Sequence, residues 1–151
     1  MISKKVSFEN LYPIIESTIK RGNEFSFCAF GRSMLPFIRD GKDVVTLGPT
    51  TDSLKTNDVV FYRRDNGQFV LHRIIRARRD GTYDLCGDNQ GYVEKGVEPR
   101  QIIAKLVRIE RNGKTVNLRS LRAKVWYLYL PVRRFLIHVK CALRRRLSLK
   151  K

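Results

Sequence analysis

The sequence predicts a mostly β domain of the α+β class, with a helix before the sheet and an amphipathic helical segment after it. Short runs rich in β-branched and aromatic residues recur between residues 24 and 118, and turn dipeptides separate several of them. On both sides of this region the apolar residues recur at helical spacing instead. With 151 residues, 42% of them hydrophobic, the chain is long enough to bury a core without disulfides.

The first expected element is a helix that ends at Gly22. Ser7 is suited to cap it, and Pro13 lies too deep to be a first-turn proline, so the helix either begins later or bends. No long apolar run occurs here, so we expect neither a secretory signal nor a membrane span. The helical spacing is carried by Phe8, Leu11, Ile14, Ile15 and Ile19.

The central region, residues 25–118, is expected to form about six to eight strands. "EFSFCAF" alternates between apolar and polar residues, and "DVVTLGP" and "DVVFYRR" are short β-rich runs. "FVLHRIIRARRDGTYDLCGDN" reads as two strands joined at Asp80-Gly81, and "IIAKLVRIERNGKTVNL" as two joined at Asn112-Gly113. This pattern predicts a mostly β core.

Positive charge is concentrated at the C-terminal end. Of the 31 Lys and Arg residues, 18 lie in residues 1–110 with all 14 acids, a balance of +4, and 13 lie in residues 111–151 with no acid, a balance of +13. After Leu118, apolar residues recur every three or four positions, which predicts an amphipathic helix that Pro131 should kink or split. The stripe consists of Leu121, Val125, Leu128, Val132, Phe135, Val139 and Ala142. The chain therefore divides into an N-terminal helix (1–24), a β domain (25–118) and a basic tail (119–151).

Three stretches of the β domain carry side chains that a hydrolase needs: "GRSMLP" (31–36), "VLHRII" (70–75) and "CGDNQGYVE" (86–94). A serine hydroxyl becomes a nucleophile when a neighbouring base takes its proton, and an acid can hold that base in the useful tautomer. Ser33, His72 and either Asp88 or Glu94 would supply these groups. Each also has a simpler interpretation: a serine in a turn, a packed histidine in a strand, and an ordinary Gly-Asp-Asn turn.

A strand that begins "NDVV" (57–60), similar to a Gly-Asp-Val-Val motif, lies between the first two stretches. In this order, the four motifs resemble the signal peptidase I and LexA-type serine peptidases, over about Phe25 to Glu110. The resemblance implies a coiled, partly open antiparallel β barrel with the serine beside a groove, to which a peptide adds as an extended strand. It implies Ser33 as the nucleophile and His72 as its base, in a His-Arg pair like that of the archaeal and ER-type signal peptidases. Asp88 and Glu94 match the acid of the family's Gly-Asp-Asn box and its later acid.

The residues around the serine are expected to contact the substrate. By the same resemblance, Gly31, Arg32, Met34 and Pro36 form the substrate and oxyanion side, and the backbone N–H of Ser33 points at the developing oxyanion. A histidine base suits neutral pH, because an imidazole with an ordinary pKa of about 6.5 is mostly able to accept a proton there.

The predicted function is that of a serine endopeptidase that cleaves an extended leader or linker peptide with a Ser33–His72 pair. The alternative is a catalytically inactive peptide- or membrane-binding module on the same fold. Two departures from the family pattern favour this alternative: Arg32 stands before the nucleophile, and Glu94 replaces an aspartate. A third departure is that Asn57-Asp58 replaces the usual Gly-Asp. No cofactor is expected, and no metal site, since the three cysteines lack a Cys-x-x-Cys spacing.

The basic tail is expected to bind an anionic membrane surface through residues 121–147, as a helix lying on the lipid. Trp126, Tyr127 and Tyr129 suit the water–lipid boundary, and the segment is too charged to be expected to cross. Two alternatives stay open: the apolar stripe packs on the β domain, or the basic residues bind nucleic acid, which the lack of any DNA-binding motif disfavours. The expected location is the cytoplasm, with peripheral binding at the inner face of the membrane.

Overall fold

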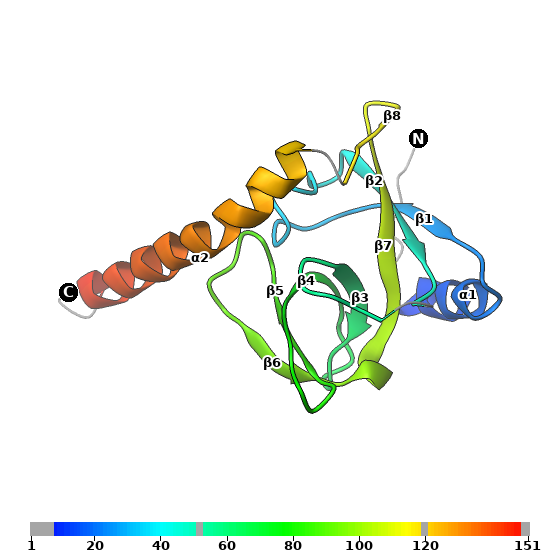
Figure 1. The fold of residues 1–151 in the computed structure, drawn as a ribbon, viewed down its shortest axis with the longest axis horizontal. Helices are drawn as coiled ribbons and strands as arrows, with labels where there is room; N and C mark the ends of the chain where they lie inside the picture. Colours follow the sequence, from blue (N-terminus) through cyan, green and yellow to red (C-terminus); the bar gives the residue numbers. More distant parts are fainter. Residues whose placement is uncertain (1–7, 51–52, 119–120, 149–151) are drawn as a thin grey trace.

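The fold is an antiparallel sheet that coils on itself without closing, with one helix before it and one after it (Figure 1). The computed structural model describes residues 8–50, 53–118 and 121–148. Within these residues the strand order is β1-β2-β7-β3-β4-β5-β6, and β8 pairs with β7. The predicted α+β, mostly β class is confirmed. The strands are β1 (Phe25–Cys28), β2 (Asp43–Gly48), β3 (Val59–Arg63), β4 (Phe69–Ala77), β5 (Tyr83–Cys86), β6 (Glu94–Val97), β7 (Ile102–Arg111) and β8 (Lys114–Thr115).

The two predicted hairpin turns join the expected strands. Asp80-Gly81 lies between β4 and β5, and Asn112-Gly113 lies between β7 and β8. Asn112 and Gly113 both have positive φ, 52° and 72°, the backbone that a two-residue hairpin turn requires. Strand β6 was not predicted, because "EKGV" consists largely of residues that are depleted in strands, yet it pairs with β5.

Helix α1 (Phe8–Lys20) packs against the sheet through Ile15 and Ile19, which join a buried cluster with Leu47 and Phe61. The helix runs through Pro13 rather than beginning after it. Ile14, which the predicted stripe included, is 55% exposed and faces outward. The predicted cap, Ser7, lies outside the described residues.

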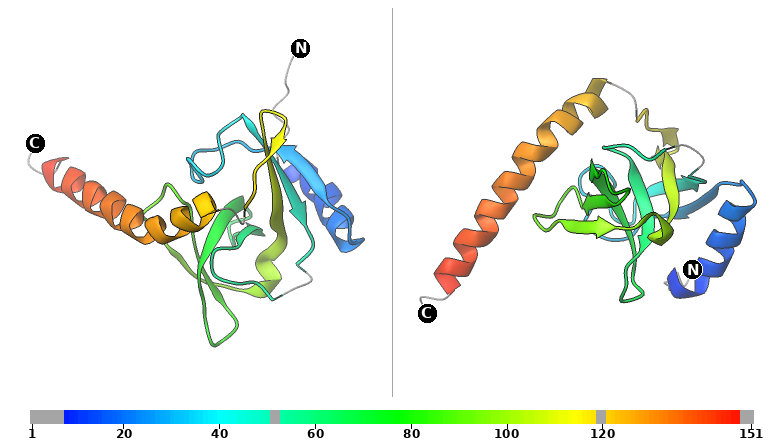
Figure 2. Two further views of the ribbon diagram at one scale, coloured as in Figure 1. Left: turned by 45° about the horizontal axis from the view of Figure 1, so that its top comes forward. Right: turned by 60° about the horizontal axis from the view of Figure 1, so that its bottom comes forward.

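Helix α2 (Leu121–Ser148) is one continuous helix, so Pro131 does not split it. Pro131 is exposed, where water can replace the hydrogen bond that its nitrogen cannot donate. The middle of α2 lies beside the loop between β5 and β6, and its C-terminal end extends away from the sheet (Figures 1 and 2). No helix in the described part of the chain is both long and apolar enough to cross a membrane.

Candidate active site

Ser33 lies in the loop between β1 and β2, which internal contacts hold at both ends. The N–H of Gly31 donates to Asp40 Oδ1 at 2.9 Å, with Gly31 at φ +119°, a backbone conformation that favours glycine. At the far end the buried carboxylate of Asp43 accepts from the backbone N–H and the guanidinium of Arg39. These contacts hold the "GRSMLP" loop, and with it Ser33, in a defined position.

The Gly87-Asp88-Asn89 box contacts the loop that carries Ser33 from the other side. Asn89 donates its backbone N–H to the Ser33 carbonyl oxygen at 2.7 Å and its side-chain amide to the Arg32 carbonyl oxygen at 3.0 Å. A Cβ at Gly87 would lie 2.7 Å from the Ser33 carbonyl oxygen and 3.1 Å from the Ser33 Cβ. Glycine is therefore required at position 87 by this close approach, and asparagine at position 89 supplies the two hydrogen bonds.

The strand register brings His72 to the same turn. Strands β4 and β5 are antiparallel, and Arg73 and Cys86 are the last pair at this end, so His72 and Gly87 are the residues that come next to this pair in the two segments. Ser33 and His72 thus neighbour the same glycine, which brings the two side chains predicted to react into one region.

The imidazole of His72 is bound at one nitrogen and free at the other. Its Nδ1 lies 3.2 Å from the Tyr62 hydroxyl and 3.3 Å from Glu94 Oε1. Because a carboxylate only accepts hydrogen bonds, this contact favours the tautomer with the proton on Nδ1. Nε2 is buried and has no hydrogen-bond partner among the described residues, so the Ser33 hydroxyl does not bond to it in this conformation. A lone pair is left at the nitrogen opposite the carboxylate.

Burial controls the charge of this histidine. His72 is 1% exposed, and desolvation lowers its pKa to about 4 against the opposing attraction of Glu94. The imidazole is therefore neutral at pH 7 and able to accept a proton. Burial also acts to raise the pKa of Glu94, but hydrogen bonds from Arg64 and Tyr62 outweigh it and hold that pKa below its usual value.

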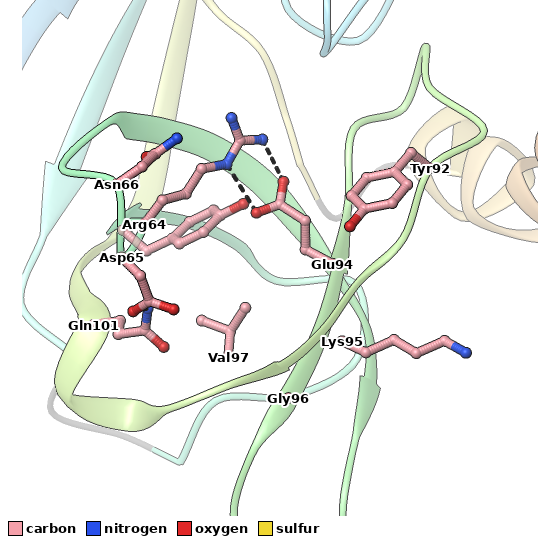
Figure 3. A pocket seen from close by; sticks show the side chains of 10 residues that line it. Arg64, Asp65, Asn66, Tyr92, Glu94, Lys95, Gly96, Val97 and Gln101 are labelled. Carbon is pink, nitrogen blue, oxygen red and sulfur yellow. Dashed lines mark hydrogen bonds and ion pairs between the residues drawn. The ribbon is translucent and has the colours of Figure 1, made fainter.

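Arg64 anchors Glu94 in turn. Its Nε donates to Glu94 Oε2 at 2.8 Å and its Nη2 to Oε1, and Figure 3 shows the two groups facing each other. They form part of the wall of a cavity of about 580 Å³ that also includes Tyr92 and Gln101. The sequence did not single out Tyr62 or Arg64. The Asn66-Gly67 dipeptide is a hairpin signal that could have supplied the register.

Asp88 binds a different partner from Glu94. Its carboxylate is fully buried and receives two hydrogen bonds from Arg73, at 2.8 and 2.7 Å. The Arg73 guanidinium lies 4.3 Å from the Phe37 ring centre and 5.0 Å from that of Tyr127. Among the described residues, Glu94 is therefore the acid that contacts His72. Asp88 instead neutralises Arg73, the buried arginine that follows His72 in the chain.

The remaining predicted residues are divided between the surface and the core. Gly31, Arg32 and Pro36 are exposed, whereas Met34 is 4% exposed and belongs to the core. Met34 and Ser33 share a cavity of about 120 Å³ whose other walls are apolar. This small cavity could hold a short apolar side chain next to the hydroxyl. Its other lining residues are Phe27, Ala29, Phe30, Ile38, Phe61, Phe69, Val70 and Leu71.

Helix α2 also contacts the Gly-Asp-Asn box, which the sequence did not indicate. Arg133 donates to the carbonyl oxygen of Asp88 and, at 2.8 Å, to Asn89 Oδ1. The indole N–H of Trp126 donates to Asp88 Oδ2 at 3.3 Å. Arg133 and Asp88 are 45 positions apart, and no pattern in a single sequence pairs an arginine of the tail with so distant a turn.

Comparison with known proteins identifies one family. Residues 2–107 match the family model described as Peptidase S24-like. No curated protein and no solved structure matches the chain. The matched region includes Ser33, His72, Asp88 and Glu94, and it ends within β7.

Proposed function

Because the chain belongs to the Peptidase S24-like family, we propose that it is a serine endopeptidase in which Ser33 attacks the peptide and His72 is its base. The observation that carries the proposal is the two-sided arrangement of His72. Nδ1 faces the carboxylate of Glu94, and Nε2, on the opposite side of the ring, is buried with no partner among the described residues. Buried polar atoms are nearly always hydrogen-bonded, so an unpartnered one calls for a functional reason.

In the proposed reaction, the Ser33 hydroxyl oxygen attacks the carbonyl carbon of the scissile bond and its proton passes to His72 Nε2. The imidazolium then gives that proton to the departing amine nitrogen, which leaves an ester of Ser33. A water molecule loses a proton to Nε2 and hydrolyses this ester, and the proton returns to the serine oxygen. Glu94 keeps its charge throughout and stabilises the imidazolium through Nδ1.

The proposed substrate is an extended leader or linker peptide with a small side chain at the cut site. The support is the cavity of about 120 Å³ beside Ser33, which has apolar walls. A side chain as small as that of alanine or valine fits within this volume, and the apolar walls favour a side chain without charge. A library of peptides that differ only at this position should therefore be cleaved fastest when the side chain is small and apolar.

A serine-directed fluorophosphonate probe tests the proposed nucleophile. The native protein should be labelled, Ser33→Ala should not be, and His72→Gln should be labelled at least a hundredfold more slowly, because the base is lost. Ser17→Ala is the matched control, since Ser17 is an exposed serine of α1. Labelling at a serine other than Ser33 would contradict the proposal.

The second candidate is an inactive peptide-binding module on the same fold. The specific observation that favours it is that the Ser33 hydroxyl does not hydrogen-bond to Nε2 in this conformation. Catalytic hydrogen bonds are often formed only once substrate is bound, so this observation is compatible with activity. An intact fold that the fluorophosphonate leaves unlabelled would favour the module.

A further inference from the structure

Helix α2 presents an exposed apolar stripe on the side that faces away from the sheet. Leu128 is 78% exposed and Phe135 is 67% exposed, values that are high for large apolar side chains. Soluble proteins seldom leave several such side chains side by side in water, and a contiguous exposed stripe indicates an interaction surface. We call these residues the outer stripe of α2: Val125, Leu128, Val132, Phe135, Leu136 and Val139.

The outer stripe does not pack on the β domain, because a different face of α2 contacts that domain. Trp126 and Arg133 bind the Asp88–Asn89 turn, and Leu130 is 1% exposed. Residues His138 and Ile137 lie 3.5 Å from the position that a Cβ on Gly91 would occupy. The alternative in which the apolar stripe packs on the sheet is therefore wrong for the described residues.

The charge of the helix limits the classes of partner that can bind the outer stripe. Residues 121–148 contain eight Lys and Arg residues and no Asp or Glu, and besides Arg133 and Arg134, which contact the Asp88–Asn89 turn, six of these cations remain. A second copy of this chain would bring the same positive charge to the stripe, and like charges repel. A nucleic acid would neutralise the cations but would leave Leu128 and Phe135 in water.

An anionic lipid surface both attracts the positive charge and removes the apolar side chains from water. We propose that α2 binds such a membrane surface through its outer stripe. Helices of this kind lie in the plane of the interface, with the apolar side chains below the headgroups and the cations among them. Tyr129, 44% exposed, lies next to Leu128 of the stripe and suits the level of the headgroups. This proposal concerns binding alone and does not depend on peptidase activity.

Lipid binding would also set where the candidate active site lies. The inner face of α2 contacts Asn89, which in turn holds the carbonyl oxygens of Arg32 and Ser33. A helix with its side chains is about 10 Å across, so the serine would be held close to the membrane surface. This consequence, unlike the binding itself, rests on the proposed function: the substrate would be a peptide presented at the lipid surface.

Vesicle flotation of the full chain tests the proposal. The probe is phosphatidylcholine vesicles with roughly one third phosphatidylglycerol, compared with vesicles of phosphatidylcholine alone, because anionic lipid attracts basic segments. The native protein should float with the anionic vesicles and bind the neutral ones far more weakly. Phe135→Glu should lower the partition coefficient about tenfold or more, since it removes one large apolar side chain from the lipid.

Ile14→Glu is the matched control, because it makes the same charge change at an exposed apolar residue of α1. It should float like the native protein, and circular dichroism should show that both variants are folded. Equal flotation of Phe135→Glu and native protein would overturn the proposal. So would a native chain that binds DNA but no anionic vesicle, or an outer stripe that mediates self-association in place of lipid binding.

Discussion

The carboxylate of Glu94 lies 3.3 Å from Nδ1 of His72, although the two residues are 22 positions apart in the chain. The β5–β6 turn reverses the chain, so that the first residue of β6 returns beside Leu85. From this position Glu94 reaches the histidine on β4, while Arg64 at the end of β3 holds its other oxygen. Sequence left two candidates for the orienting acid, and the contacts of Glu94 and Asp88 distinguish them.

Glu94→Gln should slow the reaction of Ser33 while leaving the fold in place. The neutral amide can offer an N–H to Nδ1 and so favours the tautomer with the proton on Nε2, which cannot act as a base. We expect the rate of fluorophosphonate labelling to fall on the order of 10²- to 10⁴-fold. Asp65→Asn is the control, since Asp65 lines the same cavity without touching His72. Full labelling of Glu94→Gln would remove Glu94 from the mechanism.

Asp88→Asn should instead reduce stability. The variant leaves the guanidinium of Arg73, which is 1% exposed, without its counter-charge, and removing one partner of a buried ion pair costs roughly 3–5 kcal/mol. Urea unfolding at pH 7 measures this free energy. Glu98→Gln, which breaks the exposed pair with Arg100, should change the stability far less, because an exposed ion pair contributes little. A fully stable Asp88→Asn that is no longer labelled would show that Asp88 acts in the chemistry.

The burial of His72 predicts a pH-dependent stability. Its pKa is about 4 in the folded protein and about 6.5 in an unfolded chain, so the fold prefers the neutral ring. The stabilisation is complete above pH 6.5 and is lost as the pH falls from about 6.5 to about 4, on the order of 3 kcal/mol in all. The free energy of unfolding in urea, measured across this range, should fall for the native protein. His72→Gln removes this titration, so its curve should be flatter between pH 4 and 6.5, and parallel curves would contradict the buried neutral ring.

Sequence alone predicted the parts of this molecule that depend on short-range patterns. The hairpins at Asp80-Gly81 and Asn112-Gly113 follow from local turn chemistry, and the outer residues of α2 follow from helical spacing. The ordered motifs around Ser33 and His72 identified the family. One further departure has a physical reason: Asn57 stands where the family usually has glycine and adopts φ +78°, a conformation that asparagine tolerates better than most residues.

The contacts that join distant segments could not be predicted from the sequence. Helical spacing divides α2 into faces but does not say which face docks, and here the docked face uses Trp126 and Arg133 on a polar turn rather than the apolar stripe. The choice is set by the buried carboxylate of Asp88 and the backbone groups beside it, which need partners once water is excluded. These groups need partners only after the sheet has formed and buried them, so no local sequence pattern predicts which face of α2 docks.

The contact between Arg133 and Asn89 predicts that α2 helps to position Ser33, the proposed nucleophile. Arg133 binds the Asn89 side chain, and Asn89 binds the carbonyl oxygens of Arg32 and Ser33, so losing the first contact frees the second to shift. Arg133→Met keeps the length of the side chain and should lower the fluorophosphonate labelling rate about tenfold, because a shift of less than 1 Å at a nucleophile is costly. Lys140→Met makes the same charge change at an exposed position of α2 and should be labelled like the native protein. A merely structural role for Arg133 would reduce the stability in urea in step with labelling. A positioning role would slow labelling of protein that is fully folded, and equal labelling of the two variants would show that the helix does not act on Ser33.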